Sequence, residues 1–457
     1  MAIETPPPAL DPAVLDGLSK ALVGALLRPE DAGYNDARKI FNAMIDRRPA
    51  VIIRPAGSED IRRAVVFARE NRLPVSVKGG GHNVAGSAVS AGGLMLDCSG
   101  MKDVQVDSGR RIAVAGAGAL LADLDQATQA HGLATPLGVV SVTGIAGLTL
   151  GGGIGWLNGK HGLACDNVIA AEIVTADGRL LTVSPDEHTD LYWAIRGGGG
   201  NFGVVTSFTY RLHPVGRVLA GGLLYPAERT KEVLRFYLEF AVSCPDELSM
   251  SASLGNDDAG RPVFGVALCW SGEQDELESA LRPLRDLGPT LDEVVPTEYC
   301  AWQSAHDEGF PLGQHHYWKS SFVTDFTDDA VDVLLHFSAE KPSAASGIGM
   351  QQLHGSAARV APAATAFPHR RSQSELLILA AWADPAETER NVAWARDFFE
   401  AMQPFAARGV YVNDLGEEEG DRVRAAYGAN YDRLAAIKAV YDPTNLFRSN
   451  QNIRPIA

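Results

Sequence analysis

The chain has 457 residues, which is enough for two or three domains with their own hydrophobic cores. Its formal net charge of −16 argues against nucleic acid or an anionic membrane as a partner, since both attract basic surfaces. No apolar run is long enough to span a bilayer, and the N-terminus lacks the basic and apolar regions of a signal peptide. We therefore expect a cytoplasmic protein. Five dispersed cysteines without a C-x-x-C pair are typical of reduced thiols.

The first part of the chain predicts a small α/β lobe. Apolar residues at near-helical spacing favour a helical lead-in within residues 1–45, followed by a short strand at 51–55. Ser58 is placed to cap a helix at 59–69, which has acidic residues in its first turn. A second apolar strand at 73–77 then leads into a glycine-rich loop.

A second lobe is expected to follow. Alternating or apolar runs predict strands at 94–97 and 112–116, and an amphipathic pattern predicts a helix at 119–131. A long glycine-dense stretch at 138–167 comes next. It is followed by a further strand at 170–175.

Beyond residue 216 the pattern changes to alternating strands and amphipathic helices, which favours an antiparallel sheet covered by helices. A last helix at about 421–439 precedes the closing tail. The fold class is therefore α+β. The expected strands lie at 248–254, 263–270, 317–322, 350–353 and 376–382, and the expected helices at 229–242, 276–286, 328–339 and 386–402.

The first candidate functional segment is the loop Lys78–Gly86, in which three consecutive glycines precede His82 and Asn83. Glycine adopts positive φ and lets the backbone approach a ligand, so such a turn aims several N–H groups at one anion. Imidazole is also a nucleophile that can bond to an electrophilic cofactor carbon. For this stretch alone, a tight hairpin with a surface histidine is an equally good interpretation.

The second candidate segment is Thr143–Asn167, which is glycine-dense, apolar and too long for one turn. Its Gly151–Gly155 portion invites comparison with a dinucleotide-binding fingerprint, but that site needs a strand, a turn and a helix within about thirty residues. No amphipathic helix pattern follows these glycines. We therefore interpret the segment as an extended wall and disfavour a NAD-type Rossmann site, and we interpret Gly197–Gly200 as a turn that packs on the same lobe.

Four segments together carry a family resemblance: Val75–Gly86, Thr143–Asn167, Asp190–Val205 and Tyr441–Asn452. The chain resembles the FAD-linked oxidases of the vanillyl-alcohol-oxidase superfamily, in particular the berberine-bridge-enzyme-like group of bacterial type. The motifs recur in order over nearly the whole chain, which makes the resemblance specific.

The resemblance implies a two-lobed PCMH-type FAD-binding domain with an α+β substrate-binding cap. The expected boundaries are an N-terminal part of the FAD-binding domain at 1–215, the cap at 216–405, and a C-terminal segment at 406–457 that returns to the FAD-binding domain.

The resemblance also implies a cofactor and its contacts. In this family the histidine after the glycine triplet carries FAD on its 8α-methyl group, and His82 stands at that position. Many relatives add a second bond from a cysteine, but Val140 stands there, and Cys165 lies in a different part of the motif, where it resembles a small apolar residue. Single attachment at His82 is therefore favoured. The implied FAD contacts are Lys78, Gly79, Gly80, Gly81, His82, Asn83, Gly86, Ser87, Thr143, Gly144, Gly147, Gly152, Gly153, Gly155, Trp156, Ile173, Val174, Asn413, Asn450 and Gln451.

The residue that accepts the substrate proton is not fixed by the resemblance. Plant relatives have a tyrosine where Asp414 stands and a glutamate in the segment that contains Arg359. Asp414 would act as a base if burial raised its pKa, although it begins an acidic run typical of a solvated loop. Tyr317 is expected on a cap strand facing the cofactor, and His354 lies near the next strand. The open candidates are therefore Asp414, Tyr317, His354 and Arg359.

His315 and His316 are neighbours on an expected strand, so their side chains point to opposite faces and at most one faces the flavin. With no further ligand cluster they make a poor metal site, and we expect no metal.

The resemblance predicts an FAD-dependent oxidase that transfers hydride from an alcohol or activated C–H bond to flavin N5, with O₂ as acceptor. Small residues at Thr143 and Thr149, on the wall that the family places near the flavin, favour access of O₂. A sugar, phenol, terpenoid or polyketide substrate stays open. The alternatives are an FAD-dependent dehydrogenase, a flavin-N5-oxide oxygenase, or a binding protein without catalysis. A monomer or small homo-oligomer is expected.

Overall fold

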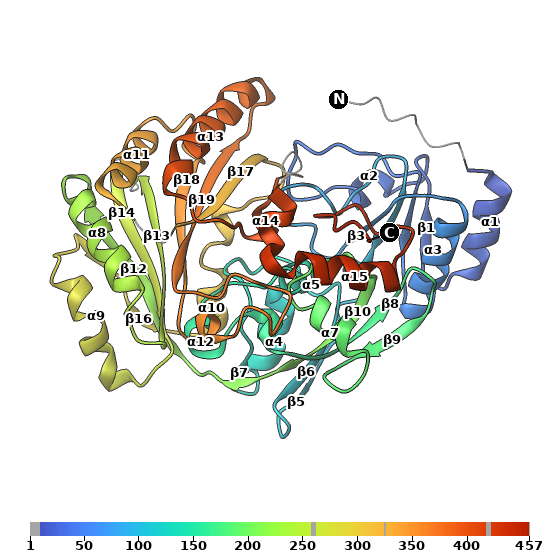
Figure 1. Cartoon of the computed structure of the whole chain (residues 1–457), viewed down its shortest axis with the longest axis horizontal. Coiled ribbons are helices and arrows are strands. Elements are labelled where there is room, and N and C mark those ends of the chain that lie inside the picture. The colour runs from blue at the N-terminus through green and yellow to red at the C-terminus, as the bar shows by residue number, and fades with distance from the viewer. Residues whose placement is uncertain (1–9, 257–261, 324–325, 417–421, 457) are drawn as a thin grey trace.

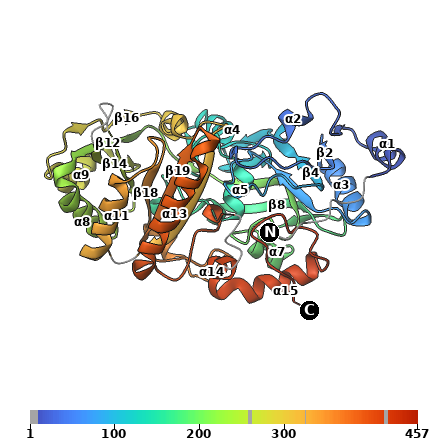
Figure 2. The same ribbon diagram turned by 90° about the horizontal axis from the view of Figure 1, so that it is seen from above.

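The computed structural model describes residues 10–256, 262–323, 326–416 and 422–456. Figure 1 shows two parts side by side, one built from the N-terminal half together with the C-terminal helices, and one built from the middle of the chain. The view from above in Figure 2 shows the same division. The domain boundaries at 215 and 405 stay predictions.

The first lobe contains a four-stranded sheet in the order β1-β2-β4-β3, in which β2, β4 and β3 run parallel. Helix α3 packs on this sheet because its apolar stripe joins the strand residues in one core. The strands are β1 (Ala25–Leu27), β2 (Val51–Arg54), β3 (Val75–Lys78) and β4 (Leu94–Asp97), and the helices are α1 (Pro12–Ala21), α2 (Tyr34–Ala37) and α3 (Ser58–Glu70).

Two expectations for this lobe are wrong in detail. Residues Ala25–Leu27 form a strand instead of continuing the first helix. The carboxylate of Asp60 explains the break, because it accepts hydrogen bonds from the backbone N–H groups of Val23 and Gly24 just after α1. Ser58 is the first residue of α3, and Gly57 is the N-cap, without a side-chain cap.

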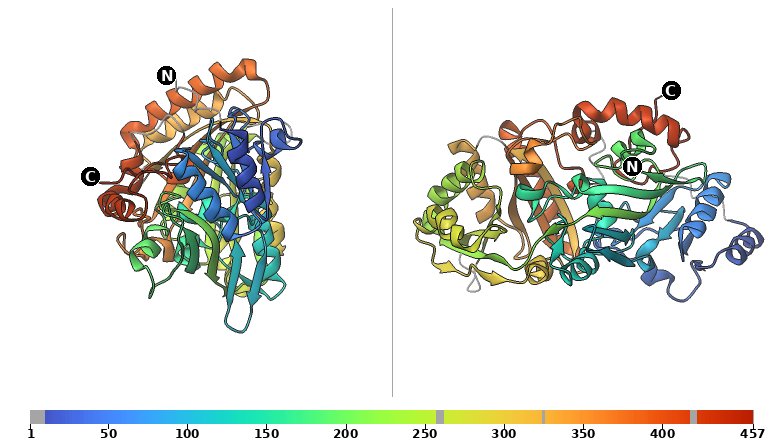
Figure 3. Two further views of the ribbon diagram at one scale, coloured as in Figure 1. Left: turned by 90° about the vertical axis from the view of Figure 1, so that its right-hand side faces the viewer. Right: turned by 90° about the horizontal axis from the view of Figure 1, so that it is seen from below.

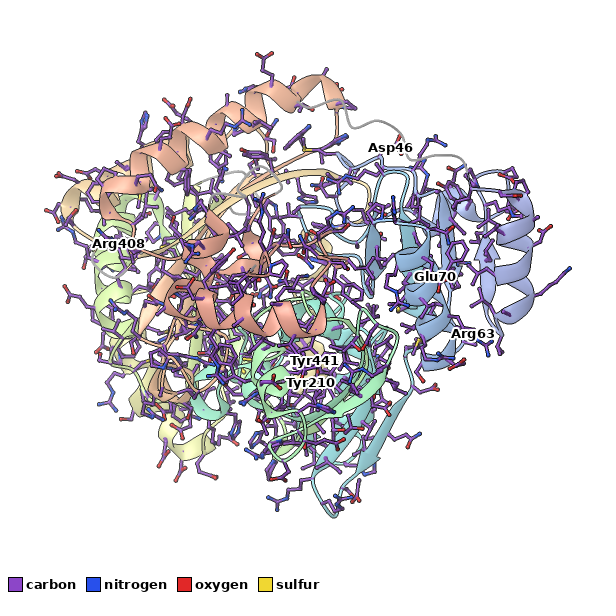
Figure 4. All side chains as sticks on the ribbon, turned by 45° about the vertical axis from the view of Figure 1, so that its right-hand side comes forward. Asp46, Arg63, Glu70, Tyr210, Arg408 and Tyr441 are labelled. Carbon is purple, nitrogen blue, oxygen red and sulfur yellow. The ribbon has the colours of Figure 1, made fainter. Side chains whose placement is uncertain are left out.

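The second lobe is a five-stranded antiparallel sheet in the order β5-β6-β10-β8-β9. The C-terminal helices pack on the same core, which contains both Tyr210 and Tyr441 (Figure 4). The strands are β5 (Val104–Asp107), β6 (Ile112–Gly116), β8 (Val168–Val174), β9 (Leu180–Val183) and β10 (Val204–Arg211), and the helices are α4 (Leu121–Gln129), α5 (Ile145–Leu150), α6 (Asn158–His161), α7 (Thr189–Ala194), α14 (Val423–Tyr427) and α15 (Tyr431–Tyr441).

The glycine stretch 138–167 is not wholly extended, because the short helices α5 and α6 lie within it. The expected tail helix is two helices, separated by a 3-10 turn at Gly428–Asn430 where Gly428 has a φ of 49°. Its expected start at Asp421 lies outside the described residues. These differences arise where glycine permits conformations that apolar spacing does not reveal.

The middle of the chain forms an eight-stranded antiparallel sheet in the order β15-β12-β14-β13-β18-β19-β17, with β16 beside β12. Helices cover one face of it, which confirms the expected cap architecture. The strands are β12 (Val218–Pro226), β13 (Leu248–Asn256), β14 (Pro262–Trp270), β15 (Leu291–Asp292), β16 (Val295–Thr297), β17 (His315–Val323), β18 (Gly347–Leu353) and β19 (Gln373–Trp382). The helices are α8 (Thr230–Ala241), α9 (Leu277–Arg285), α10 (Tyr299–Ser304), α11 (Asp328–Ala339), α12 (Gly355–Arg359) and α13 (Thr388–Met402).

The two faces of the cap sheet differ. Helices α8, α11 and α13 bury Leu234, Leu334 and Trp394 against one face, and Figure 3 shows α11 and α13 on this outer side. The other face looks toward the first part of the molecule. None of the described helices combines the length and the apolar character that a membrane crossing requires.

Candidate functional site

A cavity of about 340 Å³ lies where the two lobes, the cap sheet and the C-terminal segment meet. The N-terminal half contributes the loop after β3 and both ends of α5. The cap contributes one residue from each of three neighbouring strands, Trp318, Gln351 and Leu377. The predicted FAD contacts that line the cavity are Gly79, Gly80, Gly81, His82, Asn83, Ser87, Thr143, Gly144, Gly147, Asn413, Asn450 and Gln451.

Glycine is required where the two glycine-rich segments touch. A Cβ atom on Gly80 would lie 2.8 Å from the Cα atom of Gly144, and it would meet the backbone nitrogen of Gly144 even closer. A Cβ atom on Gly144 would meet Gly80 in the same way. Because both contacts are with backbone, no side-chain rotation relieves them. The two loops therefore form one continuous wall of peptide groups that lines the cavity.

His82 lies in this wall and is half-buried, with its ring on the cavity side. Its Nε2 atom is buried and has no hydrogen-bond partner in the part of the chain that the structure describes. Burial lowers the pKa of His82 to about 4, so the imidazole is neutral near pH 7 and its ring nitrogen lone pair is available. A buried polar atom without a partner needs an explanation, and a bond to a ligand in the cavity that the residue lines is one such explanation. The Nε2 atom fits a bond to a cofactor placed in the cavity.

The ring of His82 is held by aromatic neighbours. It stacks on Phe41 with ring centroids 4.2 Å apart, and the ring of His316 stacks on Phe41 at the same separation. His316 therefore faces the His82 side of β17, whereas His315 stacks on Trp382. The expectation that at most one of the two histidines faces the cofactor side agrees with this placement.

Tyr411 organises the second glycine triplet. Its hydroxyl oxygen accepts hydrogen bonds from the Gly153 N–H at 3.0 Å and from the Asn413 side-chain amide at 2.8 Å. Gly151 is packed so closely on Asn413 that a Cβ atom there would lie 2.5 Å from the amide carbon. Residues 151–155 thus form a layer behind Tyr411, and only Ile154 among them lines the cavity.

Several predicted FAD contacts do not line the cavity. Lys78 donates to the carbonyl oxygen of Ala37, and Trp156 packs on Trp302 of α10. A side chain at Gly86 would collide with Ile45. The set outside the lining consists of Lys78, Gly86, Gly152, Gly153, Gly155, Trp156, Ile173 and Val174.

The C-terminal tail closes the other end of the cavity. Asn450 donates to the carbonyl oxygen of Gly200 at 3.0 Å, and Gln451 donates to that of Leu415 at 2.8 Å. The tail is held by the Lys438 ammonium, which donates to the carbonyl oxygen of Phe447 and to the carboxylate of Asp442.

Among the four proton-acceptor candidates, Asp414 lines the cavity and the other three do not. The orientation expected for Tyr317 is wrong, because its hydroxyl contacts Arg396 of α13 on the outer face of the cap sheet. Arg359 is exposed and forms an ion pair with Asp246, in which Nη1 and Oδ1 are 3.0 Å apart. His354 is buried against Gly159, and it is also absent from the lining of the cavity.

The structure also adds residues that the sequence did not single out. Trp318, Gln351 and Leu377 line the cavity, and the buried acid Glu375 stands two residues before Leu377. Strand periodicity identifies two faces but not which one is turned to the cofactor. For Glu375, an acid directly before the apolar run 376–382 was the available signal.

Val140 lines the cavity at the position where many relatives have the second linking cysteine. Cys165 does not line it, and its sulfur lies 3.8 Å from the guanidinium of Arg370. Thr143 lines the cavity, whereas Thr149 is fully buried and bonded to the Tyr210 hydroxyl at 2.8 Å, away from it. In the described ranges no group of three or more His, Cys, Asp or Glu side chains is arranged to hold a metal ion.

The glycine-lined cavity is compatible with a flavin site, and comparison with known proteins shows the class to be that of the FAD-linked oxidoreductases. Residues 49–184 match the family model of an FAD binding domain, and residues 410–454 match the model described as berberine and berberine like. The chain belongs to the berberine-bridge-enzyme-like family of FAD-linked oxidoreductases.

Similar proteins cover nearly the whole chain. A FAD-linked oxidoreductase of Bacillus subtilis, YgaK, is 33% identical over 95% of this chain and 98% of its own length. The (R)-6-hydroxynicotine oxidase of Paenarthrobacter nicotinovorans is 31% identical over 95% of this chain and 97% of its own length. The crystal structure of 6-hydroxy-D-nicotine oxidase from Arthrobacter nicotinovorans superposes with a TM-score of 0.88 at 29% identity, covering 95% and 98% of the two chains.

We expect Gly80→Ala to prevent FAD retention and to lower the free energy of unfolding by about 2 kcal/mol, because the added Cβ atom meets the Gly144 backbone. The measurements are the flavin-to-protein absorbance ratio and the denaturant midpoint. Gly222→Ala in β12, where an added Cβ atom has no neighbour within 4 Å, is the control and keeps full flavin content. Equal flavin content in the two variants would contradict this account of the glycine contact.

Proposed function

We propose that this oxidoreductase holds FAD covalently, through a bond from a ring nitrogen of His82 to the flavin 8α carbon. We further propose that it oxidises an alcohol or activated C–H bond of a small organic molecule, with O₂ as the electron acceptor. The observation that carries the proposal is the buried Nε2 atom of His82, which has no hydrogen-bond partner among the described residues and stands in the wall of a cavity lined by the glycine loops of an FAD-binding family.

When bound, FAD supplies a two-electron acceptor for the substrate hydride. The chain supplies position and surroundings. Gly80 and Gly144 allow peptide groups to approach the cofactor without intervening side chains. Phe310, Trp318 and Leu377 give the cap side of the cavity an apolar surface that excludes water, and Gln351 and Asp414 place polar groups within it.

The proposed substrate is a small molecule that enters between the cap sheet and the flavin. The relative named (R)-6-hydroxynicotine oxidase acts on a small aromatic compound, which agrees with the aromatic side chains Phe310 and Trp318 in this chain. A sugar, phenol, terpenoid or polyketide substrate is equally compatible with the family, so the cap residues decide the choice.

Single attachment at His82 is part of the proposal. Val140 stands in the cavity wall and has no nucleophilic atom. Burial raises the pKa of the Cys165 thiol to about 12, so it stays protonated and poorly nucleophilic. The neutral imidazole of His82 is therefore the better nucleophile of the two.

Acid precipitation of the purified protein tests the linkage. We expect a yellow pellet in which the peptide containing His82, and not the peptide containing Cys165, carries the mass of FAD. A colourless pellet under a yellow supernatant would show that FAD binds without a covalent bond. Rapid reoxidation of photoreduced enzyme by air would support O₂ as the acceptor, and slow reoxidation would favour the dehydrogenase alternative.

A further inference from the structure

Glu375 is a buried acid on the cavity side of the cap sheet. It lies in β19, where its register partners are Gln351 of β18 and Phe322 of β17. Gln351 lines the cavity, and so does Leu377, two residues farther along the strand and therefore on the same face as Glu375. The side chain is 1% exposed, so it stands just behind the surface that the substrate would touch.

Asp414 approaches the same point from the C-terminal segment. It ends the 3-10 turn Val412–Asp414, lines the cavity, and is hydrogen-bonded to the Glu375 side chain. Two carboxyl groups that share a hydrogen bond require a proton between them. The second oxygen, Glu375 Oε1, has no hydrogen-bond partner among the described residues.

Among the residues that the structure describes, Tyr411, Arg422 and Lys319 are titratable or charged groups on or beside the elements that carry the pair. The Tyr411 hydroxyl is affected by both acids, which together with burial hold its pKa well above the ordinary value. Arg422 donates to the backbone oxygen of Ser320, and Lys319 lies over the rings of Tyr317 and Phe399 on the outer face of the sheet. The pKa of Glu375 is raised mainly by its burial and next by the neighbouring Asp414.

Burial raises the pKa of Glu375 well above its ordinary value, and the neighbouring Asp414 charge raises it further. When two acids interact this strongly, the second proton leaves only at much higher pH than the first. The shared hydrogen bond and the direction of this shift together favour a pair that keeps one proton and carries one negative charge.

We propose that Glu375 and Asp414 form a proton-sharing carboxyl pair that receives the hydroxyl or amine group of the substrate, with Asp414 as the catalytic base and Glu375 as its positioning residue. The proposal rests on the function proposed above. As the substrate is oxidised, the C–H bond breaks and its electron pair leaves with hydrogen as hydride to FAD. The O–H or N–H bond breaks as well, its proton passes to Asp414, and a C=O or C=N bond forms.

The single negative charge also sets the class of substrate. A neutral alcohol or a cationic amine places a hydrogen-bond donor on Asp414, whereas a carboxylate or phosphate group would be repelled from the same position. Apolar and aromatic side chains around it, Phe310, Trp318 and Leu377, provide few competing donors. The preferred substrates are therefore apolar or aromatic alcohols and amines without an acidic group next to the reacting carbon.

Infrared spectroscopy tests the pair without any substrate. We expect the flavin-containing enzyme to show the C=O stretching band of a protonated carboxyl group at neutral pH, and we expect Glu375→Gln to remove it. Asp125 is the matched control, since it is also buried, its pKa is raised to about 7, and it pairs with Gln303 outside the cavity. In Asp125→Asn the band assigned to Glu375 must persist. A wild-type spectrum without that band would overturn the pair.

Binding of three aromatic probes of equal size tests the charge at the cavity. Benzyl alcohol, benzylamine and benzoate are titrated while the flavin absorbance is followed. We expect benzoate to bind wild type about tenfold or more weakly than benzyl alcohol, and Asp414→Asn to remove this difference. In Glu375→Gln the new side-chain amide still offers Asp414 a hydrogen-bond donor, so we expect the difference between benzoate and benzyl alcohol binding to remain. Benzoate binding wild type as tightly as benzyl alcohol would overturn the proposal, as would failure of all three probes.

Anaerobic flavin reduction tests the proton acceptor. With benzyl alcohol, benzylamine and (R)-6-hydroxynicotine as probes, we expect Asp414→Asn to slow reduction about 100-fold and to abolish its rise with pH. An unchanged rate or pH profile would overturn the role of Asp414, and no reduction of wild type by any probe would contradict the substrate class. The acid precipitation experiment does not depend on this pair, so failure of the flavin linkage is distinguishable from failure of the pair.

Discussion

The His82→Ala variant is expected to give a colourless pellet on acid precipitation, with all flavin in the supernatant. The methyl group of alanine cannot form the bond to the flavin. Neither alternative position can replace it, because Val140 lines the cavity but has no nucleophilic atom, and Cys165 does not line the cavity. The glycine walls are untouched by this substitution. We therefore expect FAD to bind reversibly and to be lost on dialysis.

His316→Ala is the matched control for this experiment. Both histidines stack on Phe41 with centroids 4.2 Å apart, so both substitutions open a gap beside the same ring. Only His82→Ala removes the proposed linking atom, and the His316 variant is expected to give a yellow pellet. A yellow pellet from His82→Ala, with the mass of FAD on the peptide containing Cys165, would instead assign the bond to that cysteine.

The glycine motifs were predictable from sequence because their chemistry is local. Three consecutive glycines before His82 predict a backbone that can approach a ligand closely. In the structure Gly80 and Gly144 touch at a point where a Cβ atom would not fit. The cap sheet was also predictable, since its strands alternate and its helices are amphipathic. The sequence pattern did not reveal that β17 turns Trp318, and not Tyr317, toward the cavity, because alternation has two phases of equal periodicity.

The carboxyl pair shows what sequence reasoning lacks at the site itself. Asp414 begins an acidic run that is typical of a solvated loop, and Glu375 stands directly before an expected strand, where the sequence analysis did not single it out. Only the tertiary fold brings these two residues, 39 positions apart (414 − 375), into one hydrogen bond, where burial raises the pKa of Glu375 well above its ordinary value.

The Lys438→Met variant is expected to lose about 3–5 kcal/mol of unfolding free energy and most of its flavin. Lys438 and Asp442 form an ion pair with Nζ and Oδ2 2.7 Å apart, and both side chains are fully buried. Methionine would leave the Asp442 carboxylate buried without its cation. That carboxylate also accepts hydrogen bonds from the Leu446 and Phe447 N–H groups, so its displacement would move the tail that closes the cavity.

Arg424→Met provides the comparison, because Arg424 forms an ion pair of similar length with Asp432 at 2.9 Å on the surface. Water already solvates both of those side chains, so the expected loss is about 1 kcal/mol or less. Denaturant unfolding of the two variants, with flavin absorbance followed in parallel, measures the difference. If Lys438→Met lost no more stability than Arg424→Met, the buried pair would not be what holds the tail, and Asn450 and Gln451 would need another anchor.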